Sequence, residues 1–193
     1  MKIVHLIAGI ALSATPSLAE ETTQLDAHEH GVGQLNIAFD ENKVAMELHA
    51  PGADIVGFEY GAKSDVDLAA IDAALQTLSD PLGLFLLPEA ASCIVITAHA
   101  KLESEDSDHD DHDEEGHDDH DDDDHDEAPG HTEFHAEYLL ECANLTEMSA
   151  ITFSYFEIFP NALELEVQVI SDKGATAFEI ERDVAKLDLR GIF

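Results

Sequence analysis

The 193-residue sequence contains no tryptophan, only two cysteines and only 8 lysine and arginine residues, against 43 aspartates and glutamates. Its formal net charge is −35 with histidine counted as neutral. A surface of this sign repels a phosphate backbone, so the composition argues against a nucleic-acid partner and favours cations. Hydrophobic residues still make up 45% of the chain, which is too many for a simply disordered acidic protein.

The apolar stretch at the N-terminus is too short to cross a membrane. Lys2 precedes residues 3–14, which are mostly apolar, and Ser17-Leu18-Ala19 has the small-x-small pattern of a cleavage site. A membrane span needs roughly 20 residues. We predict a signal peptide over residues 1–19, cleaved after Ala19, and a single exported domain over residues 20–193 that is not embedded in a membrane. A buried N-terminal strand is the less favoured alternative.

Cys93 and Cys142 are the only cysteines. Export would place them in an oxidising compartment, where an even pair of cysteines favours a disulfide. A metal site built on the two cysteines is the alternative, and oxidation outside the cytosol disfavours it. We therefore predict a disulfide between Cys93 and Cys142.

Much of the negative charge lies in one segment. Residues 103–127 contain 17 acidic residues, five histidines and no lysine or arginine. The segment has no aliphatic or aromatic side chain whose burial could offset the entropy of ordering, so we predict a disordered, metal-binding loop over residues 103–130. Strand-like apolar sequence on both sides indicates that this loop interrupts one domain rather than linking two.

The rest of the chain predicts an α+β fold with mainly antiparallel sheet. Residues 34–39 and 44–49 alternate between apolar and polar side chains on either side of the turn at residues 40–42, which is the pattern of a hairpin. The same reasoning predicts further strands, which are punctuated by proline, glycine and asparagine turns. These strands are expected at residues 93–102, 131–142, 150–159, 163–170 and 175–180.

One principal amphipathic helix is expected in the first half of the chain. Ser64 followed by Asp67 resembles the start of a capped helix, and Asp80-Pro81 ends it. Four apolar residues share one helical face at spacings of three, four and three. They are Leu68, Ile71, Leu75 and Leu78.

Two histidines open the exported domain. His28 and His30 would share one face of a strand, where two imidazoles can supply half of a tetrahedral zinc site. His49 could complete this site from the second strand of the hairpin, and Glu59 could reach the same region. A solvated pair of terminal histidines is the alternative.

A second metal-competent pattern follows the acidic segment. His131, Glu133, His135 and Glu137 alternate with apolar residues and are expected on one strand face. Imidazole and carboxylate groups are zinc ligands, so the pattern favours a metal site over a merely solvated strand face. His99 has no partner at ligand spacing, and we expect it to be structural rather than a ligand.

The acidic segment adds histidines to its carboxylates. Imidazole mixed with carboxylate chelates divalent transition metals, whereas a purely acidic tract would favour calcium. Zinc is the favoured ion, Cu²⁺ or Ni²⁺ are further possibilities for this loop, and a solubilising spacer is the alternative function. The candidate loop ligands are His109, His112, His117, His120 and His125.

Several motifs, taken in order, resemble the ZrgA-type periplasmic zinc-binding proteins of Gram-negative bacteria, and the resemblance covers essentially the whole exported chain. The histidine-rich insertion stands in the middle of these motifs. The others are His28-Glu29-His30-Gly31, Gln34 to Ala38, Ala50 to Glu59, His131-Thr132-Glu133-Phe134 leading to Tyr138 and Cys142, and Phe156 to Pro160.

This resemblance implies zinc capture in the periplasm and delivery to an inner-membrane importer of the ABC type. The sequence departs from the family pattern at Tyr60, where the family has a histidine, and His49, His135 or the loop could compensate. The zinc ligands implied by position are His28, His30, Glu59, His131 and Glu133.

Motifs typical of hydrolytic enzymes are missing. The chain has neither a His-Glu-x-x-His helix nor a Gly-x-Ser-x-Gly elbow, so we expect a binding protein rather than an enzyme. One alternative is a periplasmic metal buffer or detoxification protein that feeds no transporter. A much less favoured alternative is an exported zinc hydrolase with an open coordination position.

Overall fold

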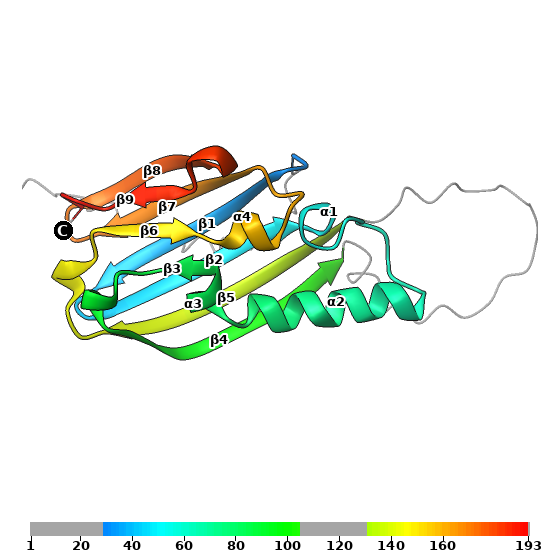
Figure 1. Cartoon of the computed structure of the whole chain (residues 1–193), viewed down its shortest axis with the longest axis horizontal. Coiled ribbons are helices and arrows are strands. Elements are labelled where there is room, and N and C mark those ends of the chain that lie inside the picture. Colours follow the sequence, from blue (N-terminus) through cyan, green and yellow to red (C-terminus); the bar gives the residue numbers. More distant parts are fainter. Residues whose placement is uncertain (1–28, 105–130, 193) are drawn as a thin grey trace, which may run out of the picture.

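The computed structural model describes residues 29–104 and 131–192, which form two packed layers (Figure 1). One layer is a six-stranded sheet with strand order β4-β5-β2-β1-β7-β8. The other holds a three-stranded sheet, of order β3-β6-β9, together with the helices. Several predictions lie outside the described residues: the signal peptide, most of the 103–130 loop, and His28, His109, His112, His117, His120 and His125.

The large sheet is mixed rather than purely antiparallel. Its neighbouring strands run antiparallel except for β1 and β7, which are parallel. The expected α+β fold with mainly antiparallel sheet is confirmed in part: the described structure is mostly β with few helices, and the parallel pair is the feature that the sequence pattern did not predict. The strands are β1 (Val32–Asp40), β2 (Lys43–Pro51), β4 (Cys93–Ser104), β5 (Thr132–Cys142), β7 (Glu164–Ser171) and β8 (Gly174–Glu181).

The predicted hairpin forms as β1 and β2. Leu35 lies opposite Leu48, and Ile37 lies opposite Met46, with all four side chains buried. The polar residues between them point to the other face, because successive side chains of a strand alternate. A hairpin with one apolar face needs a covering layer, and the second layer supplies it.

The second layer contains short strands and helices. Its strands are β3 (Phe85–Leu86), β6 (Ala150–Phe153) and β9 (Lys186–Asp188). Its helices are α1 (Gly52–Ile55), α2 (Asp65–Leu78), α3 (Pro81–Leu84) and α4 (Tyr155–Ile158), with 3-10 turns η1 (Glu89–Ala91), η3 (Leu145–Glu147) and η4 (Arg182–Val184). None of the helices in the described part of the chain is long and apolar enough to span a membrane.

The expected strand over residues 150–159 is wrong in its second half. The strand ends at Phe153, and α4 follows it. Tyr155 and Phe156 are consecutive and both are buried. Two adjacent residues of a strand point to opposite faces, so a helical turn suits this pair better.

Helix α2 begins and ends where the sequence predicts. The Ser64 hydroxyl accepts a hydrogen bond from the Asp67 N–H at 3.1 Å, which caps the first turn. The buried stripe differs from the expected one, because Ile71, Ala74 and Leu78 are buried whereas Leu68 is exposed.

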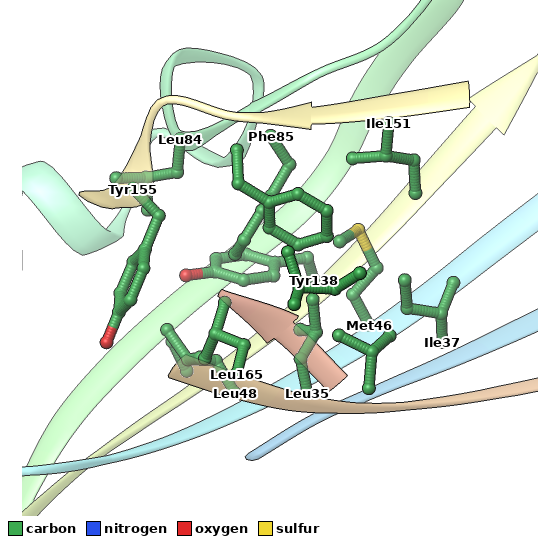
Figure 2. Close-up of a cluster of buried hydrophobic side chains, with 14 of the residues drawn as sticks. Leu35, Ile37, Met46, Leu48, Leu84, Phe85, Tyr138, Ile151, Tyr155 and Leu165 are labelled. Carbon is green, nitrogen blue, oxygen red and sulfur yellow. The ribbon is translucent and has the colours of Figure 1, made fainter. Parts of the chain in front are cut away.

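The core lies between the two layers (Figure 2). Phe85, Ile151 and Tyr155 of the second layer pack over apolar side chains of the sheet, among them Leu35 and Leu165. This packing leaves the opposite face of the sheet exposed or half-buried, and that face carries mainly polar side chains. Any metal site on the sheet therefore has to lie on the outer face or at its rim.

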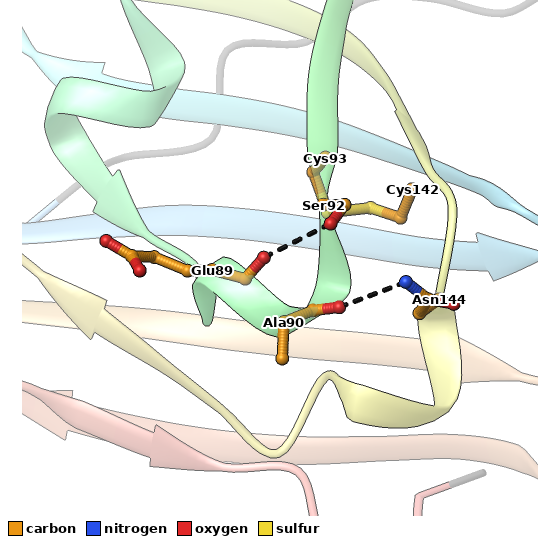
Figure 3. Close-up of a disulfide and its surroundings, with 6 residues drawn as sticks. All are labelled: Glu89, Ala90, Ser92, Cys93, Cys142 and Asn144. Atoms are coloured by element: carbon orange, nitrogen blue, oxygen red, sulfur yellow. Dashed lines mark hydrogen bonds between the residues drawn. A yellow bond between two sulfur atoms is a disulfide. The ribbon is translucent and has the colours of Figure 1, made fainter.

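Cys93 and Cys142 form a disulfide (Figure 3). They are directly opposite one another at one end of the β4–β5 ladder, and Ser104 and Thr132 pair at the other end. The disulfide agrees with the sequence prediction. It does not lie at the ends of the 105–130 segment, because the whole paired length of β4 and β5 separates the two.

Candidate metal centres

Histidine and glutamate side chains gather at one end of the large sheet. At this end β2 finishes, β5 begins, and β4 finishes at Ser104. The chain leaves here for the 105–130 segment and returns at His131. Two groups of three metal-competent side chains lie here, and within each group the ligand atoms are within 4.8 Å of one another.

Site 1 consists of His30, Glu59 and His131. One carboxylate oxygen joins the three side chains: Glu59 Oε2 lies 2.9 Å from His30 Nε2 and 2.9 Å from His131 Nδ1. The two imidazoles are exposed, at 65% and 49% of the side-chain surface, whereas the carboxylate is only 11% exposed. Site 1 therefore lies at the rim of the sheet, with its two imidazoles open to solvent and its carboxylate largely buried.

The turn that carries His30 is fixed by backbone contacts of the next residue. The Gly31 N–H donates to Oδ1 of the buried Asp54 at 2.8 Å. The Gly31 carbonyl accepts hydrogen bonds from the N–H groups of Leu163 and Glu164 at 2.8 and 2.9 Å. Gly31 has a φ of 91°, a left-handed conformation that favours glycine. Two distant segments, at Asp54 and at Leu163–Glu164, thus place the histidine.

Glycine also allows the segment that leads to Glu59 to approach β5. A Cβ atom at Gly52 would lie 2.3 Å from Thr132 Oγ1 and 2.7 Å from the carbonyl oxygen of Phe58. Only a residue without a side chain fits between these two atoms. Close packing of α1 against the start of β5 brings Glu59 beside His131.

Site 2 consists of His49, Glu133 and His135. His49 and His135 are directly opposite in the β2–β5 ladder, and their ring centroids are 4.1 Å apart. Glu133 Oε2 lies 2.5 Å from His135 Nε2 and 3.5 Å from His49 Nδ1. The three side chains are 27%, 13% and 13% exposed in the order His49, Glu133, His135, so this site is more buried than site 1.

The protonation equilibria of Glu133 and His49 favour a cation at site 2. Burial acts to raise the pKa of Glu133, but hydrogen bonds from His135 and His49 outweigh it and lower this pKa to about 2. The hydrogen bond to Glu133 raises the pKa of His49, against the opposing effect of burial. The carboxylate is therefore ionised, and a metal ion entering the site replaces the proton that holds the pair together.

Other carboxylates surround the two imidazoles of site 2. His49 Nε2 lies 3.2 Å from Glu47 Oε1, which leaves its Nδ1 facing the site. An imidazole whose second nitrogen contacts a carboxylate is oriented for metal binding. His135 Nε2 lies 3.4 Å from Glu103 Oε2 as well as close to Glu133.

Each site offers two imidazoles and one carboxylate, which is a ligand set that zinc uses in proteins. The described residues of each group supply three ligands, and zinc takes four. In both sites the carboxylate oxygen already lies between the two imidazoles. A divalent cation can replace the protons between these groups without a change of ligand type.

The structure separates residues that the sequence pattern placed together. The expected alternation holds, because Glu133 and His135 point away from the core on β5. However, His131 lies in site 1 whereas Glu133 and His135 lie in site 2. The two neighbouring ligands implied by the resemblance, His131 and Glu133, thus belong to different groups.

Two expectations, one about His49 and one about His30, need correction. The hypothesis that His49 could complete a site with His28 and His30 does not hold for His30, because the register of β2 and β5 places His49 opposite His135 instead. His30 was expected on a strand, but β1 begins only at Val32, so this histidine lies in the preceding turn. Its position depends on the Gly31 contacts rather than on strand alternation.

Three other residues lie apart from both groups. Glu137 is exposed, opposite Glu47 on one neighbouring strand and His99 on the other. His99 is exposed on the outer face of the sheet rather than built into the core. The ring of Tyr60, where a family histidine was expected, stacks on Phe58 with centroids 4.8 Å apart.

Sequence reasoning missed the residues that support the sites. Asp54, Glu47 and Glu103 were not singled out, because their roles depend on contacts between segments that are far apart in the chain. The aspartate lies within a motif that carried the resemblance, which was the one available clue.

Within residues 29–104 and 131–192, a mixed β-sheet carries two His/Glu groups at one rim, which makes this part of the chain a small β fold with two candidate transition-metal sites. Residues 27–189 match the family described as ZrgA family zinc uptake protein, and the chain belongs to this family. The expected resemblance is thereby confirmed. The family supports zinc as the ion and gives no support to copper or nickel. A search of the curated proteins found no match to the chain.

Proposed function

We propose that the protein is a periplasmic, non-enzymatic zinc carrier that holds Zn²⁺ at sites 1 and 2. The observation that carries this proposal is the arrangement of Glu59 and Glu133, each of which places one carboxylate oxygen between two imidazoles. Membership of a zinc uptake family supports zinc as the cargo. The predicted signal peptide and the disulfide support an oxidising compartment.

The 105–130 segment is proposed to collect zinc for the two sites. The residue before it, Ser104, follows Glu103 beside site 2, and the residue after it, His131, belongs to site 1. A tethered chain holds its own ligands near the sites at effective concentrations of up to about millimolar, so zinc captured loosely can transfer within the molecule. His28 is proposed as a further ligand of site 1, because the family resemblance implies it and it lies two residues before His30.

Zinc held by the protein is proposed to pass to an inner-membrane importer of the ABC type. The exposed imidazoles of site 1 suit such a transfer, because a receiving protein can reach them from solvent. Growth of a strain that lacks the protein tests this step. We expect poor growth under zinc scarcity, whereas a defect confined to zinc excess would indicate a buffer and contradict delivery.

Calorimetric zinc titration tests the two sites and the collecting segment together. The intact protein is compared with a variant lacking residues 105–127 and with the double variant Glu59→Gln, Glu133→Gln. We expect the deletion to remove the weaker binding events and leave two tighter ones, and the double variant to lose those two. Unchanged zinc stoichiometry in the deletion would contradict the collecting role, and unchanged tight binding in the double variant would contradict the sites.

A further inference from the structure

Glu103 is a further carboxylate beside site 2, next to the imidazole nitrogen of His135 that also contacts Glu133. We propose that Glu103 is the fourth protein ligand of site 2, and that Lys101 holds this carboxylate beside the site while no metal is bound. The inference rests on the proposed zinc binding at site 2 and specifies how that site is closed and opened.

Strand register places Glu103 beside the site. In the β4–β5 ladder Glu103 is opposite Glu133, and Lys101 is opposite His135. All four side chains therefore point to the outer face of the sheet. The two glutamates flank the same imidazole: His135 Nε2 lies 2.5 Å from Glu133 Oε2 and 3.4 Å from Glu103 Oε2.

A fourth ligand decides how tightly zinc is held. Structural zinc sites are closed by four protein ligands, whereas open sites keep a water molecule in the fourth position. With Glu103 the ligand set becomes two imidazoles and two carboxylates. Its side chain is 30% exposed, against 13% for Glu133, so it lies on the solvent side of the group and can close over an ion that has entered.

Lys101 competes with the metal for this carboxylate. Its ammonium group forms an ion pair with Glu103, and this hydrogen bond lowers the pKa of the glutamate. The lysine side chain is 61% exposed, so the ion pair is screened by water and is easily exchanged for a metal ion. The pair holds the carboxylate close to His135, at the cost of weak competition with zinc.

The test uses full-length protein carrying Glu59→Gln, in which site 2 is the remaining ordered site. Zinc affinity and the absorption spectrum of bound Co²⁺ are measured for Glu103→Gln and for Glu137→Gln. The latter is the matched control, because it removes the same charge from the same sheet face but is opposite Glu47 and His99 rather than opposite a residue of the group. We expect Glu103→Gln to weaken zinc binding about tenfold or more and to change the Co²⁺ spectrum, and the control to change neither substantially.

A second variant tests the lysine. Lys101→Met should strengthen zinc binding by about twofold to fivefold, in line with the small contribution of an exposed ion pair. This gain should disappear when Glu103 is already glutamine, because the lysine acts through that carboxylate.

Two results would overturn the inference. One is a loss in Glu103→Gln no larger than in Glu137→Gln, with an unchanged Co²⁺ spectrum. The other is a Lys101→Met gain that persists without the glutamate, since this would indicate simple charge repulsion. If Glu133→Gln also left zinc binding unchanged, the proposal that site 2 binds zinc would be refuted. That outcome is distinct from a failure of the Glu103 assignment alone.

Discussion

Sites 1 and 2 have the same ligand types but are assembled in different ways. Site 1 brings together a turn before β1, the segment after α1 and the residue before β5, so each of its side chains comes from outside regular structure. The group of three at site 2 is built entirely on two hydrogen-bonded strands, and its histidines are direct cross-strand neighbours. The first also exposes its imidazoles much more than the second.

This difference indicates how each site keeps its geometry. A β ladder fixes the spacing of opposite residues without further contacts, so site 2 is preorganised by the fold. Site 1 depends on a few tertiary contacts, chiefly the Gly31–Asp54 hydrogen bond and the close approach of Gly52 to Thr132. Variants that loosen loops should therefore affect site 1, and variants that act on strands should affect site 2.

The largest effect on stability is expected from the disulfide. Cys93 and Cys142 are separated by 49 positions in the chain, and replacing both by alanine should lower the free energy of unfolding by about 4 kcal/mol. Zinc affinity at site 2 should change by less than about twofold below the unfolding transition, because the bridge lies at the far end of the β4–β5 ladder. Denaturant unfolding and zinc titration measure the two quantities. Parallel losses of stability and of site 2 affinity would contradict preorganisation by the local ladder.

Removal of the central carboxylates should separate the sites most clearly. Glu59→Gln is expected to weaken zinc binding at site 1 by about 100-fold and to leave site 2 unchanged, and Glu133→Gln to do the reverse. Each glutamine keeps the size of the side chain but removes the charge that lies between two imidazoles. Histidine chemical shifts followed during zinc titration distinguish the sites. Loss of both sites in either single variant would mean that they share one ion.

A smaller and one-sided effect is expected from Asp54→Asn. The substitution removes the charge of the carboxylate that accepts the Gly31 N–H and so loosens the turn that carries His30. Zinc affinity at site 1 should fall by about tenfold, as is typical for residues that orient a ligand from outside the site. Site 2 serves as the internal control. Equal losses at both sites would show a general destabilisation, and Asp54→Glu, which keeps the charge, should recover part of the affinity.

The smallest effect is expected from a modest change of pH. The raised pKa of His49 means that its contact with Glu133 stabilises the metal-free fold fully below about 6.5, the ordinary histidine value, and loses this contribution as pH rises through the raised pKa. The pKa of Glu133 is lowered to about 2, so its contribution is present above the ordinary value of 4.5 and is lost as pH falls through about 2. The metal-free pair therefore stabilises the fold most between about 4.5 and 6.5.

Zinc has to displace the proton of His49, and this imidazole becomes more protonated as pH falls through its raised pKa. Zinc affinity at site 2 should therefore fall several-fold from pH 7.5 to pH 6.5. Glu47→Gln removes one of the groups that raise the pKa of His49 and should move this loss to lower pH. Titrations in buffers of different ionisation enthalpy count the released protons. An unchanged pH profile in the variant would contradict the assigned role of the histidine.

Local sequence patterns predicted the elements but not their partners. Alternation identified the β1–β2 hairpin and the outward face of β5, and Ser64 marked the start of α2. The pairing of His49 with His135 could not be predicted in this way, because it depends on the register of two strands more than 80 residues apart in the chain. The same holds for Glu103, whose neighbour lies beyond the acidic segment.

The combination of His131 with His30 and Glu59 in site 1 was implied by the family resemblance rather than by spacing. No periodicity connects His30, Glu59 and His131, since each lies outside a strand or helix. Their meeting depends on tertiary contacts of Gly31 and Gly52, whose conformation and packing leave no visible pattern in the sequence. Sequence periodicity is therefore informative about a site built on strands, and much less informative about one built on turns.

Anomalous scattering at the zinc edge from crystals of the zinc-loaded protein tests the central claim most directly. We predict two separate ordered ions at the rim of the sheet, one bound by His30, Glu59 and His131 and the other by His49, Glu133 and His135. A single ion ligated by both His131 and Glu133, or no ion at either group, would contradict the account.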